Sequence, residues 1–212
     1  MIPLLLQPAL CRCLVVGGGP VGQRRATLLL EGGAAVRLVC LEPSRELPAP
    51  HLLEWLQEPY TTRHLEGMTL VVAAAPAAVN VQVAADARAR GVWVNRADAP
   101  EQSDFHFPAV HRQGPLLLTA STSGTSPALA KRIRQGWATQ FDVTYGQWLE
   151  ILADLRALVK QLPAEAQDRA WQFLTADHWG HRLRERGLTQ VRQEMIQGMG
   201  LPGTFPPQHV QG

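Results

Sequence analysis

Three glycines near the start of the chain, Gly17, Gly19 and Gly22, follow the spacing G-x-G-x-x-G. At such a turn the first glycine adopts a backbone angle that a β-carbon forbids. The second lets a pyrophosphate approach the main chain, and the third lets helix and strand pack closely. We expect Pro20 and Val21 to begin a helix whose free N–H groups and positive dipole end attract the anion. The spacing therefore predicts a dinucleotide-binding turn.

A carboxylate stands at the position where such a turn needs one. Glu42 comes twenty residues after Gly22 and directly follows Leu41, the last residue of the apolar run 36–41. Its side chain would accept hydrogen bonds from the adenosine ribose and repel a 2′-phosphate, which favours NAD over NADP. The alternative is a solvated loop carboxylate, and Arg45 would weaken the preference if it turned inward. We expect Ala74, which ends a later apolar run, on the nicotinamide side.

A second carboxylate, Asp98, follows the apolar run 92–95 within the segment NRADAP. A carboxylate beside a nicotinamide could accept the proton that leaves a substrate when a hydride goes to the cofactor. The alternative is a turn-forming aspartate before Ala-Pro, which is a common arrangement. The residues alone favour the two interpretations equally.

Composition narrows the class of protein. The chain has 212 residues and a formal net charge of +2, with no electrostatic footprint for nucleic acid or an anionic membrane. Its three cysteines, at positions 11, 13 and 40, have no pairing or zinc-ligand spacing and indicate a reducing compartment. The apolar residues 2–6 have neither the basic residues before them nor the small-residue cleavage site after them that a signal peptide has. No run of eighteen apolar residues exists that would span a bilayer. We therefore expect a cytoplasmic protein without a resident metal.

The elements that must position these residues alternate in type. Apolar β-branched runs alternate with helical patterns, which predicts a Rossmann-like, doubly wound parallel α/β sheet. We expect strands at 14–16, 36–41, 60–63, 70–74 and 92–95, a proline-bearing connection at 43–50, and helices at 20–30, 51–57 and 77–90.

The pattern changes after residue 95. Runs at 105–111 and 116–121, separated by the turn signal RQGP, predict antiparallel strands with Pro108 at an edge or bulge. A helix capped by Ser126 follows, and Leu129, Ile133, Trp137 and Phe141 form an apolar stripe that we expect to be buried, as helix–helix core or subunit interface. Further helices are predicted at 148–162, 164–174 and 182–199, before a frayed tail at 200–212. The expected domains are 1–104 (NAD-binding), 105–142 (dimerisation and substrate), 143–200 (helical) and 201–212 (tail).

Four segments in a fixed order carry a family resemblance. They are LVVGGGPVGQRRATLLL, VNRADAPEQSDFHFPAV, RQGPLLLTASTSGTSPALAKRIR and YGQWLEILADLR. Together, over residues 2–160, they resemble the precorrin-2 dehydrogenase family, the module that also forms the amino-terminal part of siroheme synthase. The resemblance implies a homodimer that oxidises precorrin-2 to sirohydrochlorin with NAD⁺ in siroheme biosynthesis, in the stand-alone form. Some members also insert ferrous iron. Asp98 matches the family's catalytic aspartate, whereas Gln23 and the step Ala75-Pro76 depart from the family pattern.

The implied substrate carries eight carboxylates, which arginine, lysine or an anion-binding nest would meet. For most of the basic residues a solvated surface charge is an equally good interpretation. For the hydroxyl-rich loop, residues 121–127, the alternative is an ordinary helix cap at Ser126. The substrate-binding candidates are Asn95, Arg96, His106, Ser121, Thr122, Ser123, Gly124 and Lys131, with Arg24, Arg25 and Arg112 near the expected mouth.

Two alternatives belong to other functional classes. One is a non-catalytic module that senses NAD and transmits its occupancy through the helices; it leaves residues 95–105 and the hydroxyl-rich loop unexplained. The other is a tetrapyrrole chelatase or carrier without redox activity.

Overall fold

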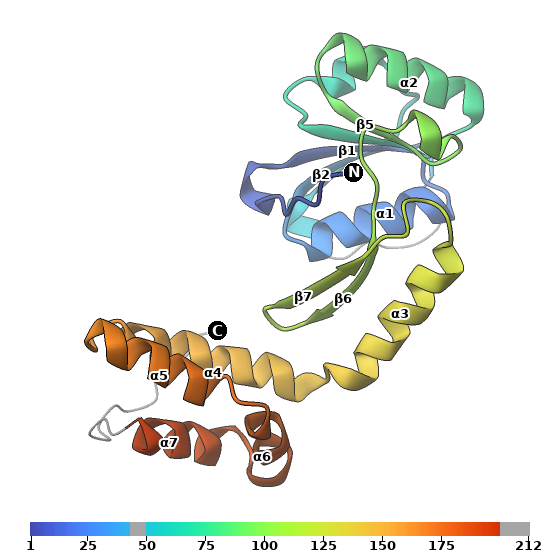
Figure 1. The fold of residues 1–212 in the computed structure, drawn as a ribbon. Helices are drawn as coiled ribbons and strands as arrows, with labels where there is room; N and C mark the ends of the chain where they lie inside the picture. Colours follow the sequence, from blue (N-terminus) through green and yellow to red (C-terminus); the bar gives the residue numbers. More distant parts are fainter. Residues whose placement is uncertain (43–49, 200–212) are drawn as a thin grey trace. The chain divides into compact units, whose positions relative to one another are not determined.

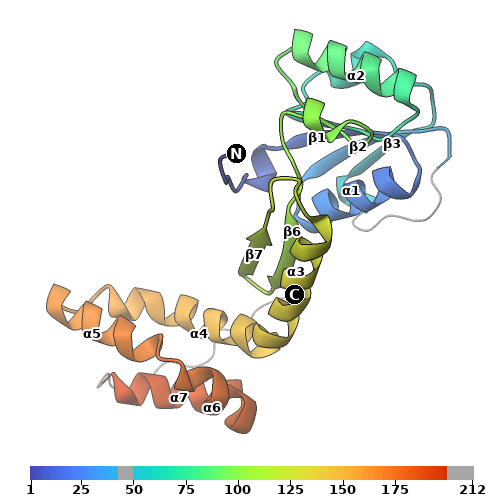
Figure 2. The same ribbon diagram turned by 45° about the vertical axis from the view of Figure 1, so that its right-hand side comes forward.

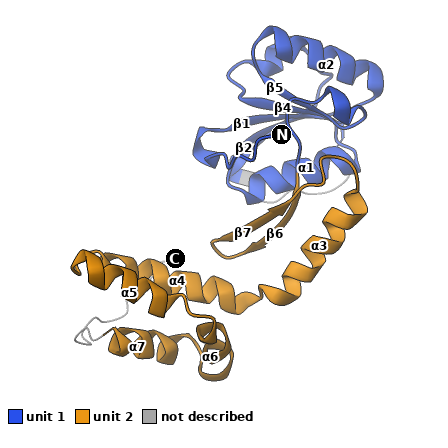
Figure 3. Cartoon of the chain, viewed as in Figure 1, with its two compact units in different colours: residues 1–107 blue, residues 108–212 orange. Residues whose placement is uncertain are grey.

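A computed structural model describes residues 1–42 and 50–199 of the chain. These residues form two compact units, residues 1–107 and the part of the chain from residue 108 onward (Figure 3). The division lies close to the boundary expected after residue 104.

The first unit is built on a five-stranded parallel sheet in the order β3-β2-β1-β4-β5 (Figure 1). Helix α1 lies on one face and helix α2 on the other. Alternate residues of β1 point to opposite faces, so that Val15 packs with Leu30 of α1 and Val16 with Val83 of α2. The predicted doubly wound sheet is confirmed. The elements are β1 (Arg12–Val16), α1 (Pro20–Glu31), β2 (Ala35–Val39), β3 (Leu53–Leu56), β4 (Leu70–Ala73), α2 (Ala77–Ala89) and β5 (Trp93–Arg96).

Two predictions between β2 and β4 are wrong. The segment 51–57, predicted as a helix, is a 3-10 turn (Pro50–Leu52) followed by β3, which pairs with β2 at the sheet edge. The predicted strand at 60–63 overlaps a 3-10 helix (Thr62–Leu65) closed by a capping box between Thr61 and His64. Short apolar runs fit either period, and here pairing with β2 decided the outcome. The expected connection at 43–50 lies mostly outside the described residues.

The second unit begins with an antiparallel hairpin, β6 (Ala109–Gln113) and β7 (Leu116–Ala120), as predicted. The turn uses Gly114 at φ +54°. The first strand starts later than the expected residue 105, because Pro108 has no N–H group to pair and Phe105 and Phe107 pack on the core of the first unit. Helix α3 (Pro127–Gln140) follows, and the Ser126 hydroxyl caps it by accepting the N–H of Leu129 at 3.2 Å.

Four helices complete the second unit: α4 (Val143–Val159), α5 (Ala164–Leu174), α6 (His178–Arg186) and α7 (Leu188–Gly198). Helix α4 packs against the other three (Figure 2). Leu155 and Met195 are fully buried in this core, and the Trp148 indole donates to the Leu174 carbonyl at 2.9 Å. The single helix predicted at 182–199 is wrong, because Gly187 at φ +76° divides it. The tail expected at 200–212 lies outside the described residues.

The apolar stripe of α3 differs from its prediction. Leu129 is 49% exposed and Ile133 37% exposed, while Trp137 and Phe141 are half-buried. The expectation that this chain buries the whole stripe is therefore wrong. Coverage by a second subunit, the other half of that expectation, stays a prediction.

No helix within residues 1–42 and 50–199 combines the length and the apolar character needed to cross a bilayer. The three cysteines are free and buried. Burial, and secondarily the neighbouring Cys11, raises the pKa of Cys13 to about 12. That thiol is consequently no nucleophile near neutral pH.

Candidate functional site

The glycine turn between β1 and α1 is packed against the end of β4. Gly17 adopts φ +115°, and a β-carbon there would lie 2.3 Å from the Ala74 carbonyl oxygen. A β-carbon on Gly22 would lie 2.0 Å from the carbonyl oxygen of Gly17 itself. The Gly17 N–H donates to the Val39 carbonyl at 2.9 Å, which ties the turn to the end of β2. The backbone after β4 therefore makes glycine necessary at the first position, and the carbonyl of Gly17 makes it necessary at the third.

The middle glycine has the opposite environment. A β-carbon on Gly19 would meet no heavy atom within 4 Å, and Gly19 caps α1 without any side-chain hydrogen bond. Pro20 and Val21 open the helix, as predicted, and both are exposed; their contact with the cofactor stays a prediction. The first turn of a helix leaves N–H groups without intrahelical partners, and its dipole favours an anion. A pyrophosphate fits this open backbone, so the residues present suit a dinucleotide.

Glu42 lies beside this turn. A β-carbon on Gly18 would come within 2.5 Å of the Glu42 carbonyl oxygen, and both Leu41 and Glu42 are exposed. The Trp55 indole of β3 donates to the Cys40 carbonyl at 3.2 Å and holds this corner of the sheet. Backbone proximity to the turn is what a ribose-binding carboxylate needs. The ribose contact itself stays a prediction, and Arg45 lies outside the described residues.

Asp98 lies two residues beyond the end of β5, and three hydrogen bonds from other side chains hold its carboxylate. Arg96 donates from Nη2 to Oδ2 at 2.7 Å and from Nε to Oδ1 at 3.3 Å, while Asn80 of α2 donates to Oδ1 at 2.9 Å. These bonds, chiefly that from Arg96, hold the pKa of Asp98 below its ordinary value. Asp98 is therefore ionised at neutral pH and oriented from two elements.

Arg96 and Asn95, both expected to bind substrate, are buried and already engaged. Besides Asp98, the Arg96 guanidinium contacts the Gln102 amide oxygen at 2.6 Å, and its bond to Asp98 raises the pKa of Arg96. The Asn95 amide donates to the Phe105 carbonyl at 2.8 Å. Their observed contacts shape the Asp98 corner, and a direct contact of either with substrate stays a prediction.

Asn80 is the functional candidate that the sequence analysis missed. It is 1% exposed, on the face of α2 that also buries Val83 and Ala87. The available signal was one amide side chain in a helix start made otherwise of alanine and valine, AAVNV, directly after a buried strand. A polar side chain in that register must find partners inside the protein.

The other predicted substrate-binding residues are spread over both units. In the first unit His106 and Arg24 are exposed, and Arg25 stacks on the Phe107 ring at 4.3 Å. In the second unit Lys131 and Arg112 are exposed.

The hydroxyl-rich loop before α3 is organised by its own side chains. The Ser121 hydroxyl accepts from the Ser123 N–H at 3.2 Å and the Thr122 hydroxyl accepts from the Ser126 N–H at 3.0 Å. Ser123 and Gly124 both have positive φ, at 54° and 85°. The loop therefore has the turned backbone of an anion nest, and its ligand stays a prediction.

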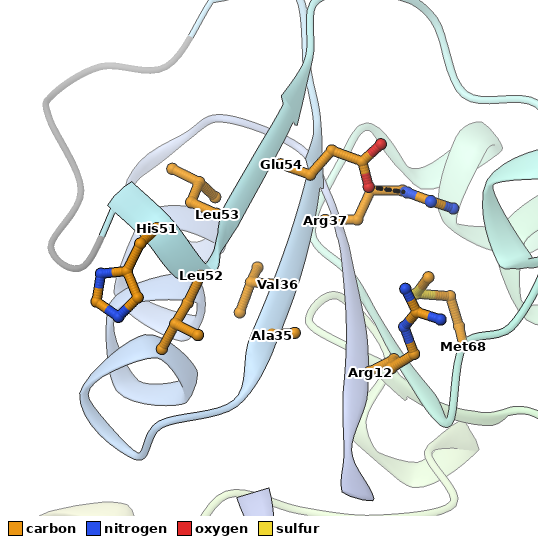
Figure 4. A pocket seen from close by; sticks show the side chains of 9 residues that line it. All are labelled: Arg12, Ala35, Val36, Arg37, His51, Leu52, Leu53, Glu54 and Met68. Carbon is orange, nitrogen blue, oxygen red and sulfur yellow. Dashed lines mark hydrogen bonds and ion pairs between the residues drawn. The ribbon is translucent and has the colours of Figure 1, made fainter. Parts of the chain in front are cut away.

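A hollow of about 220 Å³ lies at the opposite ends of the strands, where β1, β2 and β3 begin (Figure 4). Arg12, Ala35 and Leu53, the first residues of β1, β2 and β3, line it, and Arg37 there pairs with Glu54 at 2.7 Å. Doubly wound sheets bind ligands at the carboxyl ends of their strands, so this hollow is not the dinucleotide site. Within residues 1–42 and 50–199, no three histidine, cysteine, aspartate or glutamate residues are grouped to hold a metal ion.

Sheet order, glycine turn and helix start together define a dinucleotide-binding domain of the Rossmann type. Residues 4–109 match a protein family described as "Putative NAD(P)-binding". Because that match spans half of the chain, the chain belongs to this family, and the predicted nicotinamide dinucleotide cofactor is confirmed.

The chain is also similar to siroheme synthases. It is 36% identical to that of Methylococcus capsulatus over 172 residues, which are 79% of this chain and 36% of the relative. It is 38% identical to that of Chromobacterium violaceum over 199 residues, 91% of this chain and 42% of the relative. The chain thus spans less than half the length of these relatives. The solved structure of SirC, precorrin-2 dehydrogenase, superposes with a TM-score of 0.74 at 23% identity, over 94% of this chain and 99% of that one, and shows the same fold. The predicted family resemblance is confirmed.

Proposed function

We propose that this protein oxidises precorrin-2 to sirohydrochlorin with NAD⁺. One observation carries the proposal: an ionised, firmly oriented carboxylate, Asp98, is hydrogen-bonded through Asn80 to the end of β4, next to the glycine turn. In a doubly wound sheet this is the edge along which the dinucleotide lies. The similarity to siroheme synthases supports the choice of a tetrapyrrole substrate.

The reaction removes two hydrogens from the substrate. Bound NAD⁺ supplies a hydride acceptor. Asp98 is the base that accepts the second hydrogen as a proton, so one C–H bond loses its electron pair to the cofactor and another hydrogen leaves its pair in the new double bond. The products are sirohydrochlorin, NADH and a proton. Arg96 keeps the carboxylate charged between turnovers, because its bond to Asp98 favours the ionised form.

The residues also favour a particular cofactor and compartment. Glu42, exposed next to the turn, would accept hydrogen bonds from the ribose hydroxyls and repel a 2′-phosphate, which supports NAD over NADP. Three free cysteines suit the reducing cytoplasm, where we place the reaction.

The second unit contributes subunit contacts and carboxylate recognition in this proposal. The exposed α3 residues Leu129 and Ile133 support a homodimer, because an apolar helix face of this kind gains stability when a second copy covers it. The nest at 121–124 and the exposed Lys131 would bind carboxylates of the substrate. The family resemblance adds insertion of ferrous iron as a second step, in which Asp98 would take up pyrrole protons.

Anaerobic incubation of the protein with precorrin-2 and NAD⁺ tests the proposal. We expect sirohydrochlorin and NADH to form together, and Asp98→Asn to slow their formation by about 10²- to 10⁴-fold while leaving NAD⁺ affinity close to that of the parent. Glu66→Gln, which changes an exposed carboxylate elsewhere in the first unit, is the matched control and should keep parental turnover. Fe²⁺ added after oxidation reports on chelation.

The outcomes separate the alternatives. An NAD-sensing module would bind NAD⁺ and leave the tetrapyrrole spectrum unchanged. A chelatase or carrier would respond only to the added Fe²⁺, or bind the tetrapyrrole without NADH appearing. Parental turnover in Asp98→Asn would remove this carboxylate from the mechanism.

A further inference from the structure

Asn80 has every polar atom of its side chain engaged. Its Oδ1 accepts the Ala75 N–H at 2.9 Å, and its Nδ2 donates to the Ala75 carbonyl at 2.8 Å and to Asp98 Oδ1 at 2.9 Å. The Ala75 N–H requires an acceptor and the Asp98 carboxylate requires a donor, so the amide has one possible orientation. With 1% of its surface exposed, Asn80 has no solvent to replace any of these partners.

These bonds connect the cofactor cradle to the carboxylate. Ala74 and Ala75 are the backbone against which Gly17 packs, at 2.3 Å and 2.9 Å from a β-carbon placed there. Asn80 forms hydrogen bonds with both polar backbone groups of Ala75, and its Nδ2 also donates to Asp98. The glycine turn, the end of β4 and Asp98 therefore form one continuous hydrogen-bonded and packed unit.

We infer that Asn80 is a positioning residue: it fixes the Asp98 carboxylate relative to the end of β4, and so relative to the nicotinamide end of the bound dinucleotide. This inference rests on the proposed role of Asp98 as base. Arg96 alone would leave Oδ1 with one long bond of 3.3 Å, because its short bond goes to Oδ2. The Asn80 bond decides where Oδ1 points.

The charges around Asp98 set the direction of the expected changes. Arg96 of β5 is the charged side chain that contacts it in the described chain, and Glu101 of the following 3-10 turn (Pro100–Gln102) acts on Arg96. The Asn80 donor lowers the pKa of Asp98 together with Arg96. Removing the donor raises that pKa, and placing a second carboxylate there raises it further.

Asn80→Asp is the sharpest variant, because it keeps the shape of the side chain and the acceptor for Ala75 while replacing the donor with a carboxylate. We expect a fall of roughly tenfold or more in kcat, with the NAD⁺ dissociation constant within a factor of about three of the parent. The acid limb of the pH profile of kcat should move upward by about one pH unit. Titration of the Asp98 side-chain carbon by NMR, on protein without cofactor, should show the same upward shift.

Val83→Ala is the control, since Val83 is fully buried on the same face of α2 one turn further on, within the apolar core between α2 and the sheet. It should lower the melting temperature and leave the Asp98 titration unchanged, which separates positioning from general loss of stability. Should Asn80→Asp fail to fold, Asn80→Ser replaces it: the shorter hydroxyl loses the reach to Asp98 and should produce the same shifts with smaller size.

Two failures are distinguishable. If Asp98→Asn keeps parental turnover, the proposed function is overturned, whatever Asn80 does. If Asp98→Asn is inactive but the folded Asn80 variant retains the parental kcat and the parental titration of Asp98, the positioning role alone is overturned.

Discussion

Two regions of the molecule differ in how their side chains are covered. One is the corner of the first unit around Asp98, and the other is the α3 face of the second unit. In the corner, buried polar groups such as Asn80 and Arg96 are paired within the chain, and α2 covers the sheet with Val83 and Ala87. On α3, apolar residues with the same helical spacing remain open, as Ile133 does. The polar groups of the corner are thus paired within the chain, whereas α3 presents an apolar surface that a second copy would cover in the proposed homodimer.

The largest expected effect separates two glycines of the same turn. Gly17→Ala must place a β-carbon 2.3 Å from the Ala74 carbonyl oxygen and hold φ at +115°. We expect a loss of about 3 kcal/mol or more in the free energy of unfolding, together with loss of NAD⁺ binding. Gly19→Ala meets no atom of the protein, so stability should stay within about 0.5 kcal/mol of the parent while NAD⁺ binding weakens.

Urea unfolding and calorimetric titration with NAD⁺ measure the two effects separately. Gly91→Ala serves as a control for positive φ alone, because that glycine has φ +68° and open space around it. Parental NAD⁺ affinity in a stable Gly19→Ala protein would show that the phosphate cradle lies elsewhere.

The core of the second unit provides the next test. Leu155→Ala deletes a side chain with 0% exposure among α4, α5, α6 and α7. The lost transfer energy and the cavity should cost about 2–5 kcal/mol. Thermal unfolding followed by circular dichroism would measure this loss, and an unchanged midpoint would contradict the observed packing of α4.

An exposed residue of the α3 stripe should behave differently. Ile133→Ser removes an apolar side chain that is 37% exposed, so the stability of the isolated chain should change by less than about 1 kcal/mol. If a second copy covers the stripe, the dimer should weaken by tenfold or more, since burying an apolar side chain of this size in an interface stabilises it by about 1–2 kcal/mol.

Sedimentation across a concentration series measures the dimer, and Lys160→Ser, an exposed change outside the stripe, is the control. A parental dimer in Ile133→Ser would remove the stripe from the interface.

What the sequence could predict depends on how far along the chain the physical cause of each feature acts. Residues whose conformation is set by nearby atoms were predictable: the turn at Gly17 needs positive φ, Ser126 caps the helix that Pro127 opens, and the RQGP turn makes a hairpin. These signals depend on a few consecutive residues. Their physical causes act locally, so the pattern suffices.

Features that depend on a distant partner were not predictable. Residues 53–56 form a strand only because β2 lies beside them, and Asn80 binds Asp98 across eighteen positions of sequence. The four-residue spacing of the apolar residues in α3 predicts which of them share a face of the helix. It does not indicate which surface covers that face. Gly187 carried a local signal that went unused, because a glycine between helical segments ends a helix readily.

The smallest effect compares two aspartates, one in each unit. Asp142 caps α4 by accepting the Thr144 N–H at 3.0 Å, and it pairs with Arg184 of α6 at 3.0 Å. The Thr144 hydroxyl also donates a hydrogen bond to Asp142. This bond, followed by that from Arg184, holds the pKa of Asp142 below its ordinary value, in the same direction as for Asp98. Asp142 therefore stabilises the second unit much as Asp98 stabilises its corner, and both carboxylates are partly exposed.

Asp142→Ala should cost about 1 kcal/mol of unfolding free energy at neutral pH, the usual value of a lost helix cap. Because the folded pKa is depressed, the charge-dependent part of this stabilisation is complete above the unfolded value of about 3.9 and disappears as the pH falls through the folded pKa. Urea midpoints at pH 7 and in stronger acid should accordingly converge for parent and variant. Asp142→Asn, which keeps an acceptor for the Thr144 N–H, should lose less at neutral pH. An equal difference between parent and Asp142→Ala at both pH values would mean that the carboxylate charge contributes nothing, and that the cap acts through its shape alone.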